Sequence, residues 1–214
     1  MERLHPAAKQ NNVAVVFSAN RLFLPYTAVT VRSLLEHGAK EKHFDLIILH
    51  SELTGAEFER LKAMTDAYGH CTLRFYDVSP LCGHIAFFTD GGNGMLTKES
   101  YYRLLIGDIL SEEYENVLYL DGDVVVRADV SCLPEKVPAG CYLAAVRDVG
   151  MIGFARDPKQ NKVLCSEIVP GMRDCVSYFN AGVLVLNLRE LRRDWPSKRL
   201  LQLAAEREWM PSML

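Results

Sequence analysis

Short apolar runs alternate with segments of helical periodicity over residues 13–78, and this alternation limits the possible folds more than any other feature of the chain. The first helical segment begins with Pro25 and ends before Gly38, and the second follows a capping box at Thr54–Glu57. The apolar runs are typical of strands buried on both faces, and they comprise Val13–Ser18, Phe44–Leu49 and Cys71–Val78. Strands that alternate with helices in this way predict right-handed crossovers in a parallel sheet.

The rest of the chain continues the pattern less regularly. A long irregular stretch, Ser79–Leu96, precedes a predicted helix from Lys98 to about Ile109, and loops of that length in a compact domain are usually functional or disordered. Three further strands and a last helix are predicted at Val117–Val126, Cys141–Val146, Asn180–Leu188 and Ser197 to about Trp209. We therefore predict an α/β fold with a doubly wound, mostly parallel sheet, in which ligands bind beyond the carboxyl ends of the strands.

Composition narrows the classes of function. The chain has 214 residues, 49% of them apolar and 24% charged, which suits one sizeable domain. A net charge of −3 gives no electrostatic basis for binding nucleic acid, and no apolar run reaches the ~18 residues of a membrane span. The polar N-terminus lacks the apolar core of a signal peptide, and the six cysteines form no CxxC pair. We therefore expect a cytoplasmic protein without a zinc site.

The stretch VLYLDGDVVV, Val117–Val126, places Asp121 and Asp123 inside an apolar run with no cation between them. Ionised carboxylates are expensive to bury unless they are paired or bind a metal. One interpretation is a hairpin with an Asp-Gly turn and both aspartates in solvent. The other is that the strand ends there and the two carboxylates share a divalent cation, whose shell is completed by phosphate oxygens. The second interpretation predicts a metal–diphosphate site.

Two chemistries would use such a site. In one, the metal neutralises a departing nucleoside diphosphate, so that a sugar is transferred. In the other, one aspartate attacks a phosphoryl group and the second acts as acid and base, as in the haloacid dehalogenase superfamily. The Asp-x-Asp motif of that superfamily normally opens the domain and needs a later Lys and an acidic pair. Here the motif lies past the midpoint and no Gly-Asp-x-x-x-Asp follows, which favours sugar transfer.

Three stretches, taken together, resemble glycosyltransferase family 8, the retaining transferases that include glycogenin and bacterial lipopolysaccharide glucosyl- and galactosyltransferases. They are VAVVFSANRLFLPYTAVTVRSLL, SYYRLLIGDILSEEYENVLYLDGDVVVRADVSCL and YFNAGVLVLNLRELRRDW, from about Val13 to Trp195. The resemblance implies a GT-A type nucleotide-diphospho-sugar transferase fold. Its Asp-x-Asp motif would bind Mn²⁺, or Mg²⁺, and the donor diphosphate.

The same resemblance implies roles for individual residues. Asp121 and Asp123 would be the metal ligands, with Gly122 between them in the cofactor-binding motif, and Arg103 would reach the donor sugar or phosphate. Ser18, Ala19 and Asn20 would line the uridine pocket. Asp148 would hydrogen-bond the sugar hydroxyls, and Asn180 and Ala181 would hold the sugar beside the reacting bond. Of these residues, the resemblance makes Asp148 and Asn180 the catalytic candidates.

Several of these residues also have a purely structural interpretation. Arg103 between apolar neighbours is compatible with a surface cation whose stem packs on the protein. Asp148 follows a strand as an ordinary turn residue would, and Asn180 before Ala-Gly suits a bend. Asn20 suits a hydrogen bond to turn backbone. Only the joint spacing of the three stretches favours the site over these readings.

The chain departs from the family pattern at two places. Asn20 stands where the family usually has Asp, and Leu22 where it usually has a polar residue; the amide oxygen of Asn20 can still accept a uracil N–H. The family domain also continues into an Asp-Gln-Asp segment and a His-x-x-Gly-x-x-Lys-Pro region, whose His is the third metal ligand. None of the six His follows Asp123, and His84 is a candidate stand-in. We therefore expect residues 1–214 to form a single GT-A domain that lacks the C-terminal part of the family domain.

The resemblance implies a retaining, Mn²⁺-dependent transfer of glucose or galactose from UDP-glucose or UDP-galactose to a carbohydrate or glycolipid acceptor, as in lipopolysaccharide biosynthesis. No residue stands out as a nucleophile, which favours front-face attack over a covalent intermediate. The alternative is a non-catalytic fragment that binds UDP or a partner. The two differ in whether a UDP-sugar is turned over or UDP is only bound.

Overall fold

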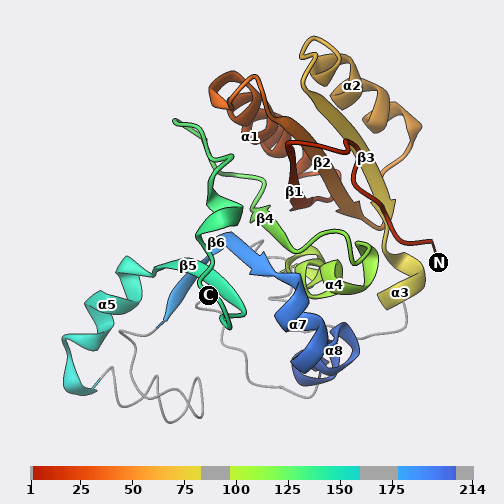
Figure 1. Cartoon of the computed structure of the whole chain (residues 1–214). Coiled ribbons are helices and arrows are strands. Elements are labelled where there is room, and N and C mark those ends of the chain that lie inside the picture. The colour runs from red at the N-terminus through yellow and green to blue at the C-terminus, as the bar shows by residue number, and fades with distance from the viewer. Residues whose placement is uncertain (1, 83–96, 160–177, 206–214) are drawn as a thin grey trace.

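The computed structural model describes residues 2–82, 97–159 and 178–205. These residues form a six-stranded sheet in the order β3-β2-β1-β4-β6-β5 (Figure 1). The strands are β1 (Asn12–Ser18), β2 (His43–His50), β3 (Cys71–Asp77), β4 (Asn116–Leu120), β5 (Leu143–Arg147) and β6 (Phe179–Asn187). Every strand predicted from the sequence is present, although the bounds differ.

The sheet is mostly parallel, as predicted. β1 pairs in parallel with β2 and with β4, and β2 pairs in parallel with β3, whereas β6 is antiparallel to both β4 and β5. The chain builds the sheet outward from β1 to β3 and then returns to place β4 on the other side of β1. The carboxyl ends of β1 and β4 therefore flank a topological switch point, the usual place for a ligand in such sheets.

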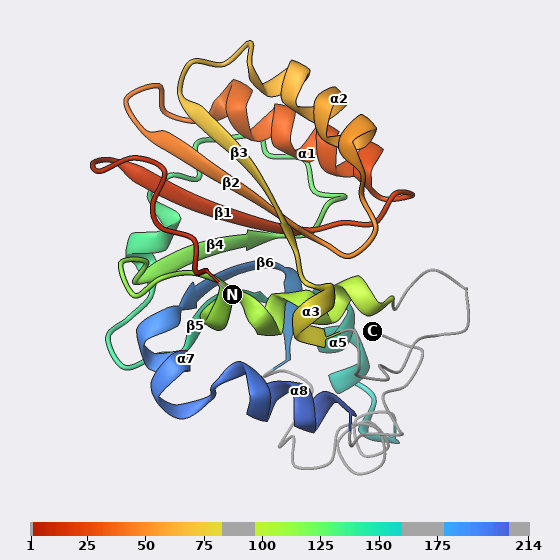
Figure 2. The same ribbon diagram turned by 90° about the vertical axis from the view of Figure 1, so that its right-hand side faces the viewer.

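Helices cover both faces of the sheet (Figure 2), which confirms the doubly wound prediction. On one face lie α1 (Leu24–His37) and α2 (Gly55–Thr65). On the other lie the 3₁₀ helix η1 (Lys98–Leu105), α4 (Ile106–Ile109), α7 (Leu188–Asp194) and α8 (Ser197–Ala205). Shorter elements are α3 (Ser79–Cys82), η2 (Leu133–Lys136) and α5 (Val149–Ala155). A helix able to cross a bilayer is not among those that the structure describes.

Each face of the sheet has its own apolar core. Successive side chains of β1 point to opposite faces, so Val15 packs with Leu34 of α1 while Val16 packs with Leu105 and Ile106. All five side chains are buried. The near-continuous apolar character of β1 therefore follows from helices on both sides.

The ends of α1 and α2 follow the predicted signals. Pro25 lies in the first turn of α1, and the capping box at Thr54 and Glu57 is formed at the start of α2. Gly38 ends α1 for a packing reason, because a Cβ there would lie 2.5 Å from ring atoms of Phe44. The backbone of Gly38 is not left-handed, so close approach and not conformational freedom explains this glycine.

Three local expectations differ from the structure. The predicted helix after Lys98 is split into a 3₁₀ helix and a single α-turn. α7 was not predicted, although Asn187 caps it by accepting the Glu190 N–H at 3.2 Å. The hairpin interpretation of Asp121-Gly122 is wrong, because β4 ends at Leu120 and the following valines form no strand.

Candidate functional site

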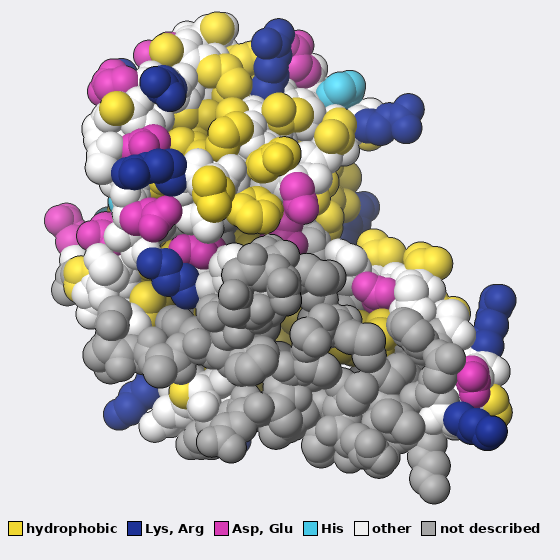
Figure 3. Space-filling view, turned by 180° about the vertical axis from the view of Figure 1, so that it is seen from behind, with side chains coloured by type: hydrophobic (Ala, Val, Ile, Leu, Met, Phe, Trp, Pro, Cys, Tyr) yellow, Lys and Arg dark blue, Asp and Glu magenta, His cyan; other side chains and the backbone are white. Residues whose placement is uncertain are grey.

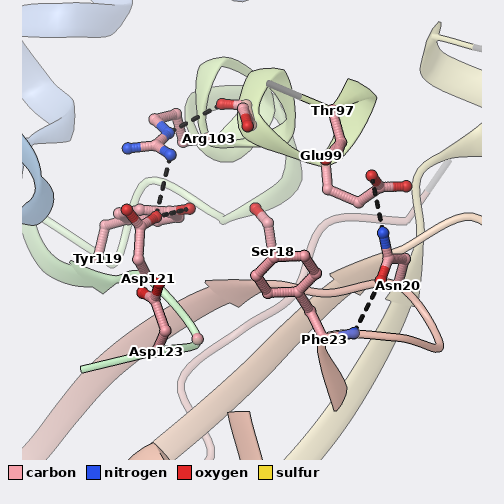
Figure 4. Close-up of a pocket in the computed structure, with 11 residues that line it drawn as sticks. Ser18, Asn20, Phe23, Thr97, Glu99, Arg103, Tyr119, Asp121 and Asp123 are labelled. Carbon is pink, nitrogen blue, oxygen red and sulfur yellow. Dashed lines mark hydrogen bonds and ion pairs between the residues drawn. The ribbon is translucent and has the colours of Figure 1, made fainter. Parts of the chain in front are cut away.

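A pocket of about 350 Å³ opens at the carboxyl ends of β1 and β4, at the switch point of the sheet. Figure 4 shows its side chains converging from β1, the start of α1, η1 and the turn after β4. The lining residues are Ser18, Asn20, Phe23, Thr97, Glu99, Ser100, Arg103, Tyr119, Asp121, Gly122 and Asp123. Six of the ten residues predicted from the sequence, far apart in the chain, thus share one pocket: Ser18, Asn20, Arg103, Asp121, Gly122 and Asp123.

Asp121 begins the turn that follows β4, and its charge is partnered from outside the strand. Its Oδ1 accepts hydrogen bonds from Arg103 Nη2 at 3.0 Å and from the Tyr119 hydroxyl at 2.9 Å. Its other oxygen, Oδ2, accepts no hydrogen bond within the described part of the chain. One face of this carboxylate is therefore fixed and the other is open to a ligand.

Arg103 is held in place by three hydrogen bonds and an aromatic ring. Its Nε donates to the Ser100 carbonyl at 2.9 Å, and its Nη1 donates to the Ala181 carbonyl at 2.5 Å. The guanidinium carbon lies 4.3 Å from the centre of the Tyr119 ring, within range of a cation–π contact. Arg103 is therefore not the free surface cation that its sequence context allowed.

Burial keeps the Tyr119 hydroxyl in its donating form. Tyr119 lies on β4 and is 1% exposed, and this burial raises the pKa of its phenol above the ordinary value. The group therefore stays protonated at neutral pH and donates to Asp121. It fixes the orientation of the carboxylate without adding charge to the pocket.

Gly122 and Asp123 form a turn pressed against α1. A Cβ on Gly122 would lie 2.3 Å from Thr27 Oγ1, so no other residue fits there without a shift. The hydroxyl of Thr30 donates to the Gly122 carbonyl at 2.8 Å and anchors the turn. Asp123 is exposed at the pocket, with its carboxyl group beside that of Asp121 (Figure 4).

The donor atoms of this turn suit a hard divalent cation. Asp121 Oδ2 and the carboxylate of Asp123 are oxygens without hydrogen-bond partners among the described residues. Gly182 leaves room beside them, because a Cβ there would lie 3.1 Å from Asp121 Oδ2. Within the described residues no third Asp, Glu, His or Cys joins this pair to form a cluster. A cation held here would complete its shell with phosphate or water oxygens.

The antiparallel strand β6 brings the third predicted stretch beside the turn that carries Asp121 and Asp123. Its first residues lie beside the turn, since Asp121 N donates to the Gly182 carbonyl at 2.8 Å. Ala181 contacts Arg103 through its carbonyl. Asn180 is exposed, and its Oδ1 accepts the Gly182 N–H at 2.9 Å, so it also forms the bend considered for it.

The opposite end of the pocket is built from Asn20, Phe23 and Glu99 (Figure 4). Asn20 Oδ1 accepts the Phe23 N–H at 2.9 Å, and Asn20 Nδ2 donates to Glu99 Oε2 at 3.3 Å. The turn role considered for Asn20 is thus real, and its amide oxygen is already engaged. Ser18 lies between this end and Asp121.

Four predicted site residues lie outside the pocket lining: Asn180 and Ala181 of β6, and also Ala19 and Asp148. Ala19 is completely buried in the core under α1, and its N–H donates to the Leu49 carbonyl at 3.0 Å. Asp148 follows β5, and its Oδ1 accepts the Met151 N–H at 3.0 Å at the start of α5. That contact matches the turn role considered for Asp148. His84 lies outside the described residues.

Leu22, which belongs with Asn20 to the first departure from the family pattern, is not among the residues that line the pocket. It is 79% exposed and lies on the solvent side of the α1 entry with Tyr26 and Val29, which are also exposed. Figure 3 shows hydrophobic side chains gathered on the upper half of the molecule seen from behind, the half that holds α1 and α2 in Figure 1. Leu22 therefore belongs to this exposed surface and not to the pocket.

Phe23, Thr97 and Glu99 were not predicted as site residues. Nothing in the local sequence marks Phe23 or Thr97, because the three residues meet only when η1 packs across the end of β1. Glu99 carried one usable signal. It is a carboxylate four residues before Arg103, on the same predicted helix.

Comparisons with solved structures define the class. The apo form of the bifunctional glycosyltransferase WbbM gives a TM-score of 0.77 at 25% identity, over 94% of this chain and 35% of that one. The galactosyltransferase LgtC, in complex with donor and acceptor sugar analogs, gives a TM-score of 0.65 at 24% identity, over 85% of this chain and 60% of that one. The sheet with its switch-point pocket is a GT-A type glycosyltransferase fold.

Sequence comparison defines the family. The profile of Glycosyl transferase family 8 matches residues 14–213, and the chain belongs to this family. A lipopolysaccharide 1,2-glucosyltransferase of Escherichia coli is 30% identical over 177 residues, which are 82% of this chain and 46% of that protein. The chain spans about half the length of the curated relatives it matches.

Proposed function

We propose that this chain binds UDP-glucose or UDP-galactose and transfers the hexose, with retention of configuration, to a hydroxyl of a carbohydrate or glycolipid acceptor. The name of the Escherichia coli relative supports an acceptor of lipopolysaccharide biosynthesis. Asp121 and Asp123 would hold Mn²⁺ or Mg²⁺. When bound, the cation neutralises charge on the diphosphate leaving group.

The observation that carries this proposal is the pair of carboxylates on one anchored turn at an open pocket. Asp121 is oriented by Arg103 and Tyr119, yet its Oδ2 remains open. Asp123 is exposed on the same turn. Oxygens held in place in this way favour binding of a metal–diphosphate, because their side chains need little further ordering when the ligand arrives.

Arg103 acts in this proposal as a positioning residue. Its hydrogen bonds join η1, the turn after β4 and the first residues of β6. These hydrogen bonds fix the positions of the three elements relative to one another before the donor binds. Asn180, Ala181 and Asp148 are proposed to contact the hexose, which lies beyond the diphosphate along the donor.

Front-face attack remains the proposed route to retention. Among the described residues, the carboxylates that line the pocket are Asp121, Asp123 and Glu99. The first two would hold the cation, and Glu99 lies at the opposite end (Figure 4). None of the three is placed as a nucleophile at the sugar, which favours attack by the acceptor hydroxyl from the leaving-group side.

A cytoplasmic location and a single GT-A domain belong to the same proposal. The described cysteines, Cys71, Cys82, Cys132 and Cys141, are all unpaired, which supports a reducing compartment. The continuous sheet with one core on each face supports a single domain.

UDP release from UDP-glucose and from UDP-galactose, with Mn²⁺ and with EDTA, tests the proposal. We expect release that needs Mn²⁺ and an acceptor saccharide and that falls at least about 100-fold in Asp123→Asn. Asp66→Asn, at an exposed ion pair with Lys62 just after the end of α2, is the matched control and should keep full activity. UDP binding without any release would support the non-catalytic alternative instead.

A further inference from the structure

We infer that Glu99 selects the nucleobase of the donor, its buried carboxylate accepting the ring N–H of uracil. This inference rests on the proposed function, because it concerns the nucleotide end of the same pocket. The residues carried over from the family resemblance do not include Glu99. Its place in the pocket is a property of this structure.

The two ends of the pocket leave one place for the base. Asp121 and Asp123 lie at one end, where the diphosphate would bind the cation. Asn20, Phe23 and Glu99 lie at the other end, with Ser18 between (Figure 4). A nucleoside diphosphate anchored by its phosphates therefore directs its base toward the second end. The ring of Phe23 faces this space and offers a stacking surface.

Glu99 is a buried carboxylate with unused acceptor capacity. The residue is 6% exposed. Within the described part of the chain, its Oε2 accepts from Asn20 Nδ2 at 3.3 Å, and its Oε1 has only Lys98 Nζ at 4.0 Å. A carboxylate has about four acceptor sites, so among the described residues this one keeps acceptor capacity for a ligand. A donor arriving with the ligand would supply the missing hydrogen bond.

Asn20 cannot replace Glu99 as the principal acceptor. Its Oδ1 is engaged by the Phe23 N–H and its Nδ2 by Glu99, and these two contacts fix which end of the amide is oxygen. The amide oxygen of Asn20 is therefore used as a hydrogen-bond acceptor at the start of α1. Glu99 is the carboxylate at this end of the described pocket lining, and it is hydrogen-bonded to that same side chain.

The chemistry of the bases makes the inference specific. The ring nitrogen N3 of uracil carries a hydrogen and donates, whereas N3 of cytosine has a lone pair and accepts. An ionised carboxylate only accepts, so it matches uracil and repels cytosine at that position. Glutamine has the same shape but can present its NH₂ group, and it would tolerate either base.

Binding of UDP and CDP, with Mn²⁺ present, tests the inference in the intact chain and in Glu99→Gln. We expect the wild type to prefer UDP by at least about tenfold. In Glu99→Gln we expect UDP to bind about 10- to 100-fold more weakly and the preference to fall toward one. Glu52→Gln is the matched control, because Glu52 accepts the Arg21 N–H at 3.0 Å beside Asn20 but does not line the pocket.

A second probe needs no change in the protein. UDP methylated at N3 of uracil cannot donate, so the wild type should bind it at least about tenfold more weakly than UDP. An unchanged UDP-to-CDP preference in folded Glu99→Gln, full affinity for the methylated ligand, or tighter binding of GDP than of UDP would overturn the inference. Mn²⁺-dependent UDP binding that persists in any of these cases keeps the proposed function, whereas its absence in the wild type removes both.

Discussion

At the scale of single residues, an absent Cβ shapes the turn that carries both aspartates. Gly122 lies against Thr27 of α1, where a methyl group would approach Oγ1 to 2.3 Å. We predict that Gly122→Ala lowers the free energy of unfolding by about 1–3 kcal/mol and weakens UDP binding, because the turn must move away from α1. Urea unfolding and titration with UDP measure the two effects.

Two further variants show whether this contact is the cause. Thr27→Ala removes the hydroxyl that the new methyl group would meet, so Gly122→Ala/Thr27→Ala should recover part of the UDP affinity. Gly55→Ala, at the start of α2 with no atom within 4 Å of its Cβ position, should behave like the wild type. A Gly122→Ala protein with wild-type stability and affinity would show that the turn is not held as described.

His50 makes stability depend on pH. It is 5% exposed, its Nδ1 accepts the Leu53 N–H at 3.3 Å, and burial lowers its pKa below 6.5, although Asp77 opposes that shift. Below pH 6.5 His50 therefore binds a proton in the unfolded chain but not yet in the folded chain. Lowering the pH from 6.5 to the folded-state pKa of His50 therefore favours unfolding.

Urea unfolding at pH 7, 6 and 5 measures that dependence. We predict that the free energy of unfolding decreases as the pH is lowered from 7 to 5. In His50→Gln the slope of this decrease should be smaller by up to about 1.4 kcal/mol per pH unit. His37→Gln, at an exposed position on α1, should keep the wild-type slope. An unchanged slope in His50→Gln would mean that His50 is not buried in its neutral form.

At the scale of elements, β2 and β3 are tied together near their amino ends by a buried charge. Asp45 is 0% exposed and accepts from Arg74 Nε at 3.0 Å and from the Tyr114 hydroxyl at 2.5 Å. We predict that Asp45→Ala destabilises the fold by about 3 kcal/mol, because it leaves the half-buried Arg74 without its counter-charge. Chemical denaturation checks this value, with the exposed Asp66→Ala as a control that should change little.

Some helices and strands could be predicted from the sequence and others could not. Local signals were sufficient for β1, α1, β2 and α2, because their apolar periodicity, Pro25 and the capping box agree with the final packing. The direction of β6 was not predictable locally, since a buried strand reads the same when parallel or antiparallel. Yet that direction places the Gly182 carbonyl 2.8 Å from the Asp121 nitrogen and so brings β6 beside the Asp-x-Asp turn.

The candidate site shows the same division. The Asp-x-Asp turn and Arg103 could be predicted because each lies in a recognisable stretch. The ends of the pocket that depend on packing could not, since Glu99 reaches Asn20 only through the position of η1. Asp148 accepts a backbone hydrogen bond at the start of α5 and Ala19 is buried in the core, and neither lines the pocket. Spacing in the sequence cannot separate such neighbours from lining residues.

At the scale of the whole molecule, the two edges of the sheet use carboxylates differently. Near the amino ends of the strands, Asp45 is fully enclosed and well partnered. At the carboxyl ends, Asp121 and Asp123 keep oxygens open to the pocket. The first arrangement stabilises the fold, and the second leaves ligand sites open at the switch point.

Calorimetric titration of UDP, with and without Mn²⁺, into the wild type and Asp121→Asn/Asp123→Asn tests the central claim most directly. We predict binding that requires Mn²⁺ and is lost in the folded double variant, because both carboxylates hold the cation that receives the diphosphate. Equal binding in EDTA, binding retained by the double variant, or no binding by the folded wild type with Mn²⁺ would contradict it.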